Sequence, residues 1–287
     1  RQLGGRSAGG AAWAGPVCVV PALADSYTTM LTTAPLALAL ELRNVHKRFG
    51  PTDIIRGASL AVAPGERVAL IGPNGAGKST LFNLISGRCA PSSGEIFLNG
   101  QRIDGKQPYD INRLGLSRSF QITHLFSGLS VWDNLRCAVL WSLGYRYSLW
   151  RRLAHLHDVN ARTRQVMAQI GLDTRQDVLA AHLTYAEQRA LEIGVTIAGN
   201  APVILLDEPT AGMSRSETTR FVQLIKQVTA GRTLLTVEHD MGVVFGLADK
   251  IAVLVYGQII AFDTPDKVRA NPRVQEAYLG CERPLPC

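Results

Sequence analysis

The sequence predicts an α/β protein in which a mostly parallel sheet carries an antiparallel β flap and an inserted helical subdomain. A short apolar run at 67–71 leads straight into a glycine-rich loop and then a helical segment. Later apolar runs at 202–206 and 233–237 enclose a helical segment at 217–228, and this order indicates parallel strands in a buried sheet. Residues 130–194 have helical spacing and little β signal, which predicts the inserted helices.

The remaining elements are expected in simple order along the chain. Candidate strands at 42–45 and 54–62 precede the glycine-rich loop, and a turn and strand at 92–100 follow its helix. That strand ends in Asn-Gly, a pair typical of tight hairpins, which predicts the antiparallel flap. Near the C-terminus, apolar runs at 251–255 and 259–262 flank Tyr-Gly-Gln and predict a closing hairpin.

The domain boundaries follow from a change in composition. Residues 1–39 are rich in Gly, Ala and Thr and contain one acidic residue, so we interpret them as a disordered N-terminal extension. We expect the functional protein to begin near Met30, with the upstream part either disordered or an artefact of the assigned gene start. The folded domain is expected at 40–281, with its helical subdomain at about 128–190. A short tail at 282–287 completes the chain.

Composition and charge limit the classes of function. A hydrophobic content of 46% supports a sizeable core, and no apolar run is long enough to cross a bilayer, so a membrane role needs a partner. The formal net charge of +7 is compatible with anionic lipid, nucleic acid or a nucleotide, but no basic run is dense enough for a nucleic-acid arm. The five cysteines are scattered without metal-ligand spacing, which favours a reducing, cytosolic setting.

The glycine-rich loop completes the pattern G-x-x-x-x-G-K-[ST], which binds the phosphates of a nucleoside triphosphate. Its glycines let backbone N–H groups converge on the phosphates, and the helix that opens at Lys78 directs its positive dipole end at them. Lys78 would neutralise the β- and γ-phosphates, and the Ser79 hydroxyl would ligate Mg²⁺. The residues expected to hold the nucleotide here are Gly72, Pro73, Asn74, Gly75, Ala76, Gly77, Lys78, Ser79 and Thr80.

Two carboxylates follow the apolar run at 202–206, at the sheet edge where ligands bind in open α/β folds. Asp207 would hold Mg²⁺, commonly through water, and Glu208 would act as general base on the attacking water. An apolar strand that ends in Asp-Glu is the Walker B pattern. Paired with the phosphate-binding loop, it is a strong signal for Mg²⁺-dependent hydrolysis of a nucleoside triphosphate.

Three further motifs lie at 119–121 (Ser-Phe-Gln), 183–189 (Leu-Thr-Tyr-Ala-Glu-Gln-Arg) and 237–240 (Val-Glu-His-Asp). With the two motifs above, they resemble those of the ABC transporter ATPases, and the resemblance covers about residues 40–281. The resemblance implies that Gln121 touches the metal and relays the nucleotide state to membrane subunits, and that His239 contacts the γ-phosphate. It places these two residues with Lys78 and Glu208 in the catalytic set. It also implies that Phe49 stacks on adenine, which is chemistry that any aromatic ring can supply.

The motif at 183–189 resembles the family signature L-S-G-G-Q, which caps the γ-phosphate of ATP held by a partner subunit. The resemblance assigns that contact to Thr184, which keeps the hydroxyl, and to Ala186. However, Tyr185 and Ala186 replace glycines and Glu187 replaces glutamine, so a methyl group and a carboxylate are expected to weaken the approach to phosphate. Ser214 also stands where the family usually has an aspartate in its D-loop.

The runs at 115–126, 238–241 and 264–280 resemble the ATPases of branched-chain (hydrophobic) amino acid importers. This resemblance implies a peripheral position on the cytoplasmic face of the cell membrane. It also implies three partners: membrane permease subunits, a second ATPase subunit that is the same or different, and indirectly a solute-binding protein. Nucleic acid is not among them. The helices at about 128–181 are expected to carry the groove that receives the permease, next to Gln121.

Other functions stay open at this point. Urea and amide importers share these features, and lipid-type exporters are broadly similar. A soluble ABC protein of repair or translation usually carries a long coiled coil or two tandem cassettes, whereas this chain has one phosphate-binding loop and no sustained heptads. A small-molecule kinase would share the phosphate-binding loop but would not need Gln121, the signature-like motif and His239 in this order.

Overall fold

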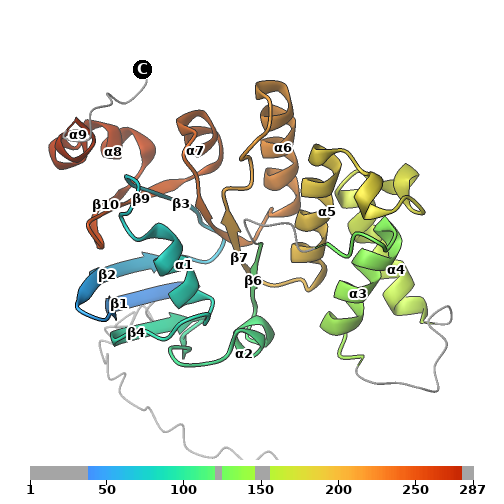
Figure 1. Cartoon of the computed structure of the whole chain (residues 1–287), viewed down its shortest axis with the longest axis horizontal. Helices are drawn as coiled ribbons and strands as arrows, with labels where there is room; N and C mark the ends of the chain where they lie inside the picture. Colours follow the sequence, from blue (N-terminus) through green and yellow to red (C-terminus); the bar gives the residue numbers. More distant parts are fainter. Residues whose placement is uncertain (1–37, 120–124, 146–155, 280–287) are drawn as a thin grey trace, which may run out of the picture. The chain divides into compact units, whose positions relative to one another are not determined.

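The computed structural model describes residues 38–119, 125–145 and 156–279, and Figure 1 shows their strands and helices in chain order. The expected extension at 1–39 lies outside the described residues except for its last two, and the tail at 282–287 lies wholly outside them. What was predicted for these two segments therefore stays a prediction.

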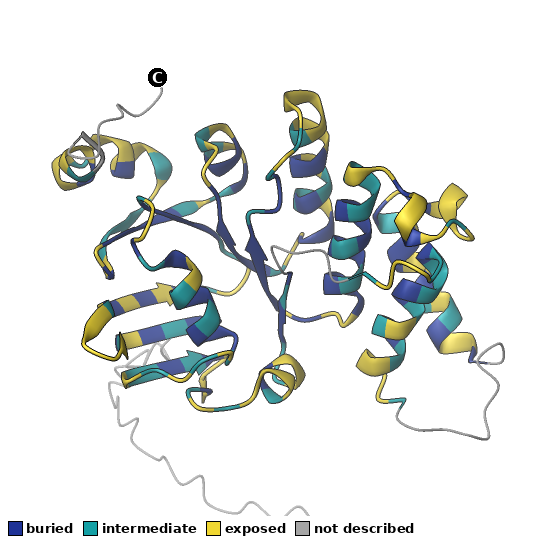
Figure 2. Ribbon diagram, in the orientation of Figure 1, coloured by how far each residue is buried: buried dark blue, intermediate teal, exposed yellow. Residues whose placement is uncertain are grey.

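The larger sheet confirms the predicted mostly parallel core. Its strands from β9 to β6 run parallel, and β10 pairs antiparallel with β9 in the predicted closing hairpin. Every residue of β7 and β8 is buried, as their continuous apolar sequences require (Figure 2). The spatial order is β10 (Gln258–Asp263), β9 (Lys250–Val255), β3 (Arg67–Ile71), β8 (Thr233–Val237), β7 (Val203–Asp207) and β6 (Leu116–Arg118).

The smaller sheet is the antiparallel flap. Its hairpin between β4 and β5 turns at Asn99 and Gly100, whose φ angles of 49° and 78° are the left-handed values that an Asn-Gly turn adopts. The first strand continues beyond the predicted 42–45, because its polar end keeps pairing with β2 as far as Phe49. The spatial order is β2 (Thr52–Val62), β1 (Leu40–Phe49), β4 (Ser93–Leu98) and β5 (Gln101–Arg102).

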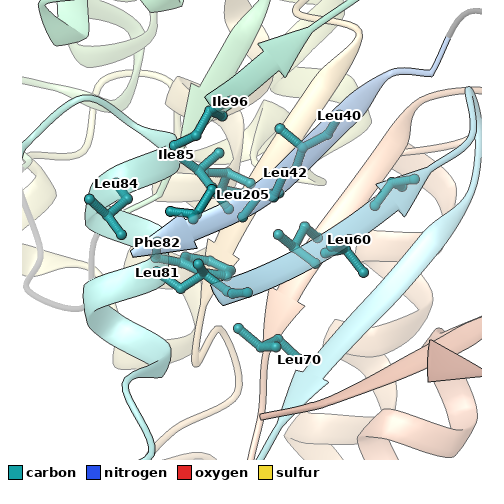
Figure 3. Close-up of a cluster of buried hydrophobic side chains, with 14 of the residues drawn as sticks. Leu40, Leu42, Leu60, Leu70, Leu81, Phe82, Leu84, Ile85, Ile96 and Leu205 are labelled. Atoms are coloured by element: carbon teal, nitrogen blue, oxygen red, sulfur yellow. The ribbon is translucent and has the colours of Figure 1, made fainter. Parts of the chain in front are cut away.

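Helix α1 (Lys78–Ile85) packs against both sheets, and this fixes the helix start that carries Lys78. Its apolar side chains share one buried cluster with the flap and the larger sheet (Figure 3). Burial of each such side chain contributes about 1.5–3 kcal/mol to folding. The cluster includes Leu81, Phe82 and Ile85 of α1, Leu40, Leu42 and Leu60 of the flap, and Leu70 and Leu205 of the larger sheet.

Further helices cover the larger sheet. α6 (Arg215–Val228) connects β7 to β8, which confirms the predicted strand–helix–strand unit. Ser214 caps this helix, because its hydroxyl accepts the N–H of Glu217 while the Glu217 carboxylate accepts the N–H of Ser214. The remaining helices of the core are α2 (Pro108–Arg113), α7 (Met241–Leu247), α8 (Pro265–Ala270) and α9 (Pro272–Leu279).

We call the inserted helices the helical arm. It comprises α3 (Val131–Ser142), α4 (His157–Gln169), the short turns η2 (Asp173–Arg175) and η3 (Ala180–His182), and α5 (Tyr185–Ala198). Leu135 of α3 and Leu191 of α5 share a second buried cluster with Ile204 and Leu206 of β7, and this cluster joins the arm to the larger sheet. Among the helices that the structure describes, none combines the length and apolarity needed to cross a bilayer.

Candidate functional site

The phosphate-binding loop connects β3 to α1 and is held closely on both sides. A side chain on Gly72 would overlap the carbonyl oxygen of Leu254 in β9, the neighbouring strand. Gly77 has φ of 104°, and a Cβ there would lie 2.7 Å from the Ile55 side chain of the flap. Glycine is therefore required at both positions, because the loop passes between a sheet edge and the flap.

Lys78 directs its ammonium group back into this loop. Its Nζ donates hydrogen bonds to the carbonyl oxygens of Gly72 at 2.8 Å and Pro73 at 3.0 Å. Burial lowers the pKa of Lys78, whereas the charges of Glu208 and Asp207 act to raise it. The ammonium thus lies between the loop carbonyls and the carboxylate edge of the sheet, where it can neutralise an anion.

The carboxylate edge brings together residues that are distant in sequence. Asp207 ends β7, and Glu208 follows it with φ of 48°, a left-handed value that is uncommon for glutamate. The Nε2 atom of His239 lies 2.6 Å from Oε1 of Glu208. Asp207 forms a buried ion pair with Arg118 at 2.9 Å. The structure therefore joins the expected general base to the expected switch histidine, and adds an arginine that the sequence did not single out.

Glu238 is a second residue that sequence reasoning missed. Its side chain is buried, and its Oε1 accepts hydrogen bonds from the Thr210 hydroxyl at 2.8 Å and the Thr210 N–H at 3.2 Å. Burial is the main cause that raises the pKa of Glu238, and the nearby Glu208 charge raises it further. An acid at the end of the apolar strand β8 was the available signal. The contact ties the turn after Glu208 to the segment that carries His239.

The expected adenine platform is accessible. Phe49 ends β1 with 53% of its surface exposed, and the Nζ atom of Lys47 lies 4.8 Å from its ring centroid. A half-exposed ring can stack on a base, whereas a core phenylalanine could not. Gln121 lies outside the described residues, so its expected place at the metal stays a prediction.

The donors expected to hold Mg²⁺ fit a metal that arrives with its nucleotide. Asp207 supplies a buried carboxylate and Ser79 an exposed hydroxyl in the first turn of α1. Both are hard oxygen donors of the kind that Mg²⁺ prefers. Among the described residues, no group of three or more His, Cys, Asp or Glu side chains could hold a metal alone. Mg²⁺ sites often take their remaining ligands from substrate phosphates and water.

The signature-like motif begins helix α5. Thr184 caps the helix in a reciprocal pair with Glu187, and Oε2 of Glu187 accepts the Thr184 N–H at 2.9 Å. Oε1 of Glu187 accepts from Nε of Arg175 at 3.0 Å. The Tyr185 hydroxyl donates to the carbonyl of Ala211 at 2.7 Å, so the motif also contacts the turn after Glu208. Both oxygens of Glu187 are thus bound by donors of this chain.

Comparison with known proteins identifies the family. Residues 55–211 match the family model described as ABC transporter. The chain belongs to the ABC transporter family. Residues 258–280 match a second model, described as branched-chain amino acid ATP-binding cassette transporter. The chain is 35% identical over 250 residues to the high-affinity branched-chain amino acid transport ATP-binding protein LivG of Escherichia coli, covering 84% of this chain and 97% of LivG.

Further relatives agree with this assignment. BraF of Pseudomonas aeruginosa, also named as a high-affinity branched-chain amino acid transport ATP-binding protein, is 34% identical over 253 residues, with coverages of 84% and 97%. The crystal structure of an ABC transporter ATP-binding cassette in its ADP conformation superposes with a TM-score of 0.74 at 26% identity, over 85% of this chain and 99% of that one. These findings confirm the expected ABC ATPase fold and an ATP-binding, transport-driving subunit.

Proposed function

We propose that this ABC ATPase powers an importer of branched-chain amino acids, and that ATP closes a dimer of ATPase subunits by bridging them. The assignment of branched-chain amino acids as the transported substrate is supported by the names of LivG and BraF and by the family-model match at 258–280. The observation that carries the catalytic assignment is the 2.6 Å contact between Glu208 and His239, at the sheet edge beside the phosphate-binding loop. That edge can hold a γ-phosphate and a water in reach of one carboxylate.

In this mechanism each residue acts on a defined part of the nucleotide. Lys78 and the loop N–H groups bind the phosphates, and Phe49 stacks on the base. Mg²⁺, held by Ser79, Asp207 and Gln121, would balance phosphate charge. Glu208 accepts a proton from the attacking water, and His239 orients Glu208 and contacts the γ-phosphate. Hydrolysis then removes the bridge between the subunits, so the dimer opens.

A cavity between the core and the helical arm is the proposed docking site for the permease. Its volume is about 790 Å³, and both α2–β6 and the helices α3 and α5 contribute to its walls. Phe126 and Trp141 line it and are 61% and 49% exposed. An apolar groove of this kind suits a short helix of a membrane subunit. A permease bound there would hold the chain at the cytoplasmic face of the membrane as a peripheral subunit, and a solute-binding protein would act only indirectly, through the permease.

ATPase assays with permease-containing membranes test this function. We expect such membranes to stimulate ATP hydrolysis, and the substitution Phe126→Asp to reduce this stimulation at least about fivefold, because a charge would enter an apolar contact. Basal hydrolysis should persist, since Phe126 is not among the residues proposed to bind or hydrolyse the nucleotide. Tyr256→Asp is the matched control, because Tyr256 is an aromatic residue that is 75% exposed between β9 and β10 and does not line the cavity. Stimulation by DNA or ribosomes instead would refute the transport assignment.

The pairing of Arg175 with Glu187 predicts how the altered signature tolerates a carboxylate. The Thr184 N–H is the main cause that lowers the pKa of Glu187, and Arg175 lowers it further, so Glu187 is charged at neutral pH. Arg175→Gln should raise the ATP concentration needed for dimer closure at least about threefold, because an unbalanced carboxylate repels phosphate. Adding Glu187→Gln to the same chain should restore closure, as measured by light scattering.

Arg43→Gln provides the control for that substitution. Arg43 pairs with Glu41 at 2.8 Å, and its side chain is 55% exposed, close to the 51% of Arg175. It lies in the flap, so breaking this pair should leave closure unchanged. If Arg175→Gln and Arg43→Gln behave alike, Arg175 has no role at the signature.

A further inference from the structure

Arg118 occupies a position that joins two parts of the molecule. It is the last residue of the edge strand β6 and lies opposite Leu205 in β7. The next residue, Ser119, continues the pairing, because its N–H donates to the Leu205 carbonyl at 2.9 Å. Arg118 and Ser119 both line the cavity between the core and the helical arm. The same two residues also contact Asp207, which ends β7.

The guanidinium group of Arg118 is buried and held from several sides. Its Nη2 donates to Oδ2 of Asp207 at 2.9 Å, with 7% and 6% of the two side chains exposed. Its Nη1 donates at 2.8 Å both to Oδ1 of Asn83 and to the hydroxyl of Ser86, which follows α1. The Phe82 ring lies beside it, with 5.6 Å from Cζ to the ring centroid. These contacts hold the planar, fork-shaped guanidinium group of Arg118 in one orientation.

Asp207 is therefore fixed at both its side chain and its backbone. The backbone N–H of Asp207 donates to the Ser119 hydroxyl at 3.4 Å, in addition to the ion pair with Arg118. A carboxylate has two oxygens, and the ion pair engages Oδ2, so the pairing is compatible with a metal contact through Oδ1. An acid at the end of a strand would otherwise be free to rotate about two side-chain bonds.

Stability alone gives a weak reason for this arrangement. Burial lowers the pKa of Arg118 and so opposes its charged form, whereas the hydrogen bond to Asp207 supports that form. The desolvation cost of a buried ion pair commonly cancels most of its Coulomb attraction. What such a pair does provide is a defined geometry, because a fork with several partners aligns the carboxylate that it binds.

We propose that Arg118 is the positioning residue of the magnesium site: its fork holds the Asp207 carboxylate in the orientation that receives the metal accompanying the nucleotide. This inference rests on the proposed function in one respect, that a magnesium nucleotide binds at the loop.

Binding of Mn²⁺, followed by electron paramagnetic resonance in the presence of ADP, tests the proposal without relying on turnover. Arg118→Met should weaken Mn²⁺ binding at least about fivefold, because the carboxylate loses its alignment. The affinity for ADP in EDTA should stay within about twofold, since the phosphate-binding loop is unchanged. Arg118→Lys should restore the loss only in part, because an ammonium has no fork. Full rescue by lysine, or unchanged Mn²⁺ affinity in Arg118→Met, would overturn the proposal.

Two further variants separate positioning from loss of structure. Ser86→Ala removes one partner of the guanidinium without touching Asp207, so it should weaken Mn²⁺ binding in the same direction but less. Arg189→Met breaks a comparable ion pair with Glu192, at 2.9 Å and with 9% and 11% exposure, and should lower thermal stability without changing Mn²⁺ affinity. If the unaltered protein binds no Mn²⁺ with ADP, the proposed function itself fails. If it binds and Arg118→Met binds equally, the inference about Arg118 alone fails.

Discussion

Glu208→Gln is expected to reduce ATP turnover at least about 100-fold while ATP still binds, because an amide cannot take the proton of the attacking water. The amide keeps the size of the carboxylate, and its oxygen can still accept a hydrogen bond from His239, which lies 2.6 Å from Oε1 in the unaltered site. Phosphate release measures turnover, and a fluorescent ATP analogue measures binding. A loss of both would indicate that Glu208 acts in binding and not as the base.

Glu276→Gln is the control for this substitution. Glu276 is exposed on α9, so the same chemical change there should leave turnover unaffected. If Glu208→Gln retains the turnover of this control, the assignment of the general base is wrong.

The second large effect is expected for Lys78→Ala, which should weaken ATP binding about 30-fold or more, because a buried charged donor is lost. In the structure the ammonium lies within 3.0 Å of two carbonyl oxygens of the loop, so it is already placed where phosphates bind. Calorimetry with ATP gives the affinity. Because burial lowers the pKa of Lys78, its removal is expected to leave folding intact at neutral pH.

Lys250→Ala controls for loss of positive charge. Lys250 is the first residue of β9, so it lies at the edge of the sheet opposite to the phosphate-binding loop. Its ammonium group pairs with Glu66 at 2.7 Å. ATP affinity should be unchanged in this variant. If both substitutions weakened ATP binding equally, the affinity would depend on the net charge of the protein and not on Lys78 in particular.

Local sequence was sufficient to predict those parts of the site that depend on neighbouring residues. The phosphate-binding loop needs glycine where the backbone passes close to Leu254 and Ile55, and that need is visible as a sequence motif. The apolar strand ending at Asp207 predicted a carboxylate at the sheet edge, because parallel strands end there. The departure at Ser214 also has a local cause, since serine with Glu217 caps the next helix.

Contacts between distant segments could not be predicted from the sequence. Arg118 and Asp207 are 89 positions apart, and their pairing depends on β6 lying beside β7, which no periodicity reveals. Glu238 likewise meets Thr210 across 28 positions. The expected conflict between Glu187 and phosphate was drawn from residue types alone, without the partner Arg175 that the fold places beside it. Charge balance at a site is set by tertiary structure.

The association state of Glu208→Gln tests most directly whether ATP is the link between two ATPase subunits. Light scattering after size exclusion would compare this variant with ATP, with ADP and without nucleotide, each in Mg²⁺, both alone and mixed with the second ATPase subunit of its transporter. We expect twice the mass of a single chain with ATP, and single chains with ADP or without nucleotide. Single chains that bind ATP without pairing, both alone and in the mixture, or pairs that form without ATP, would contradict the proposal that ATP links the two subunits.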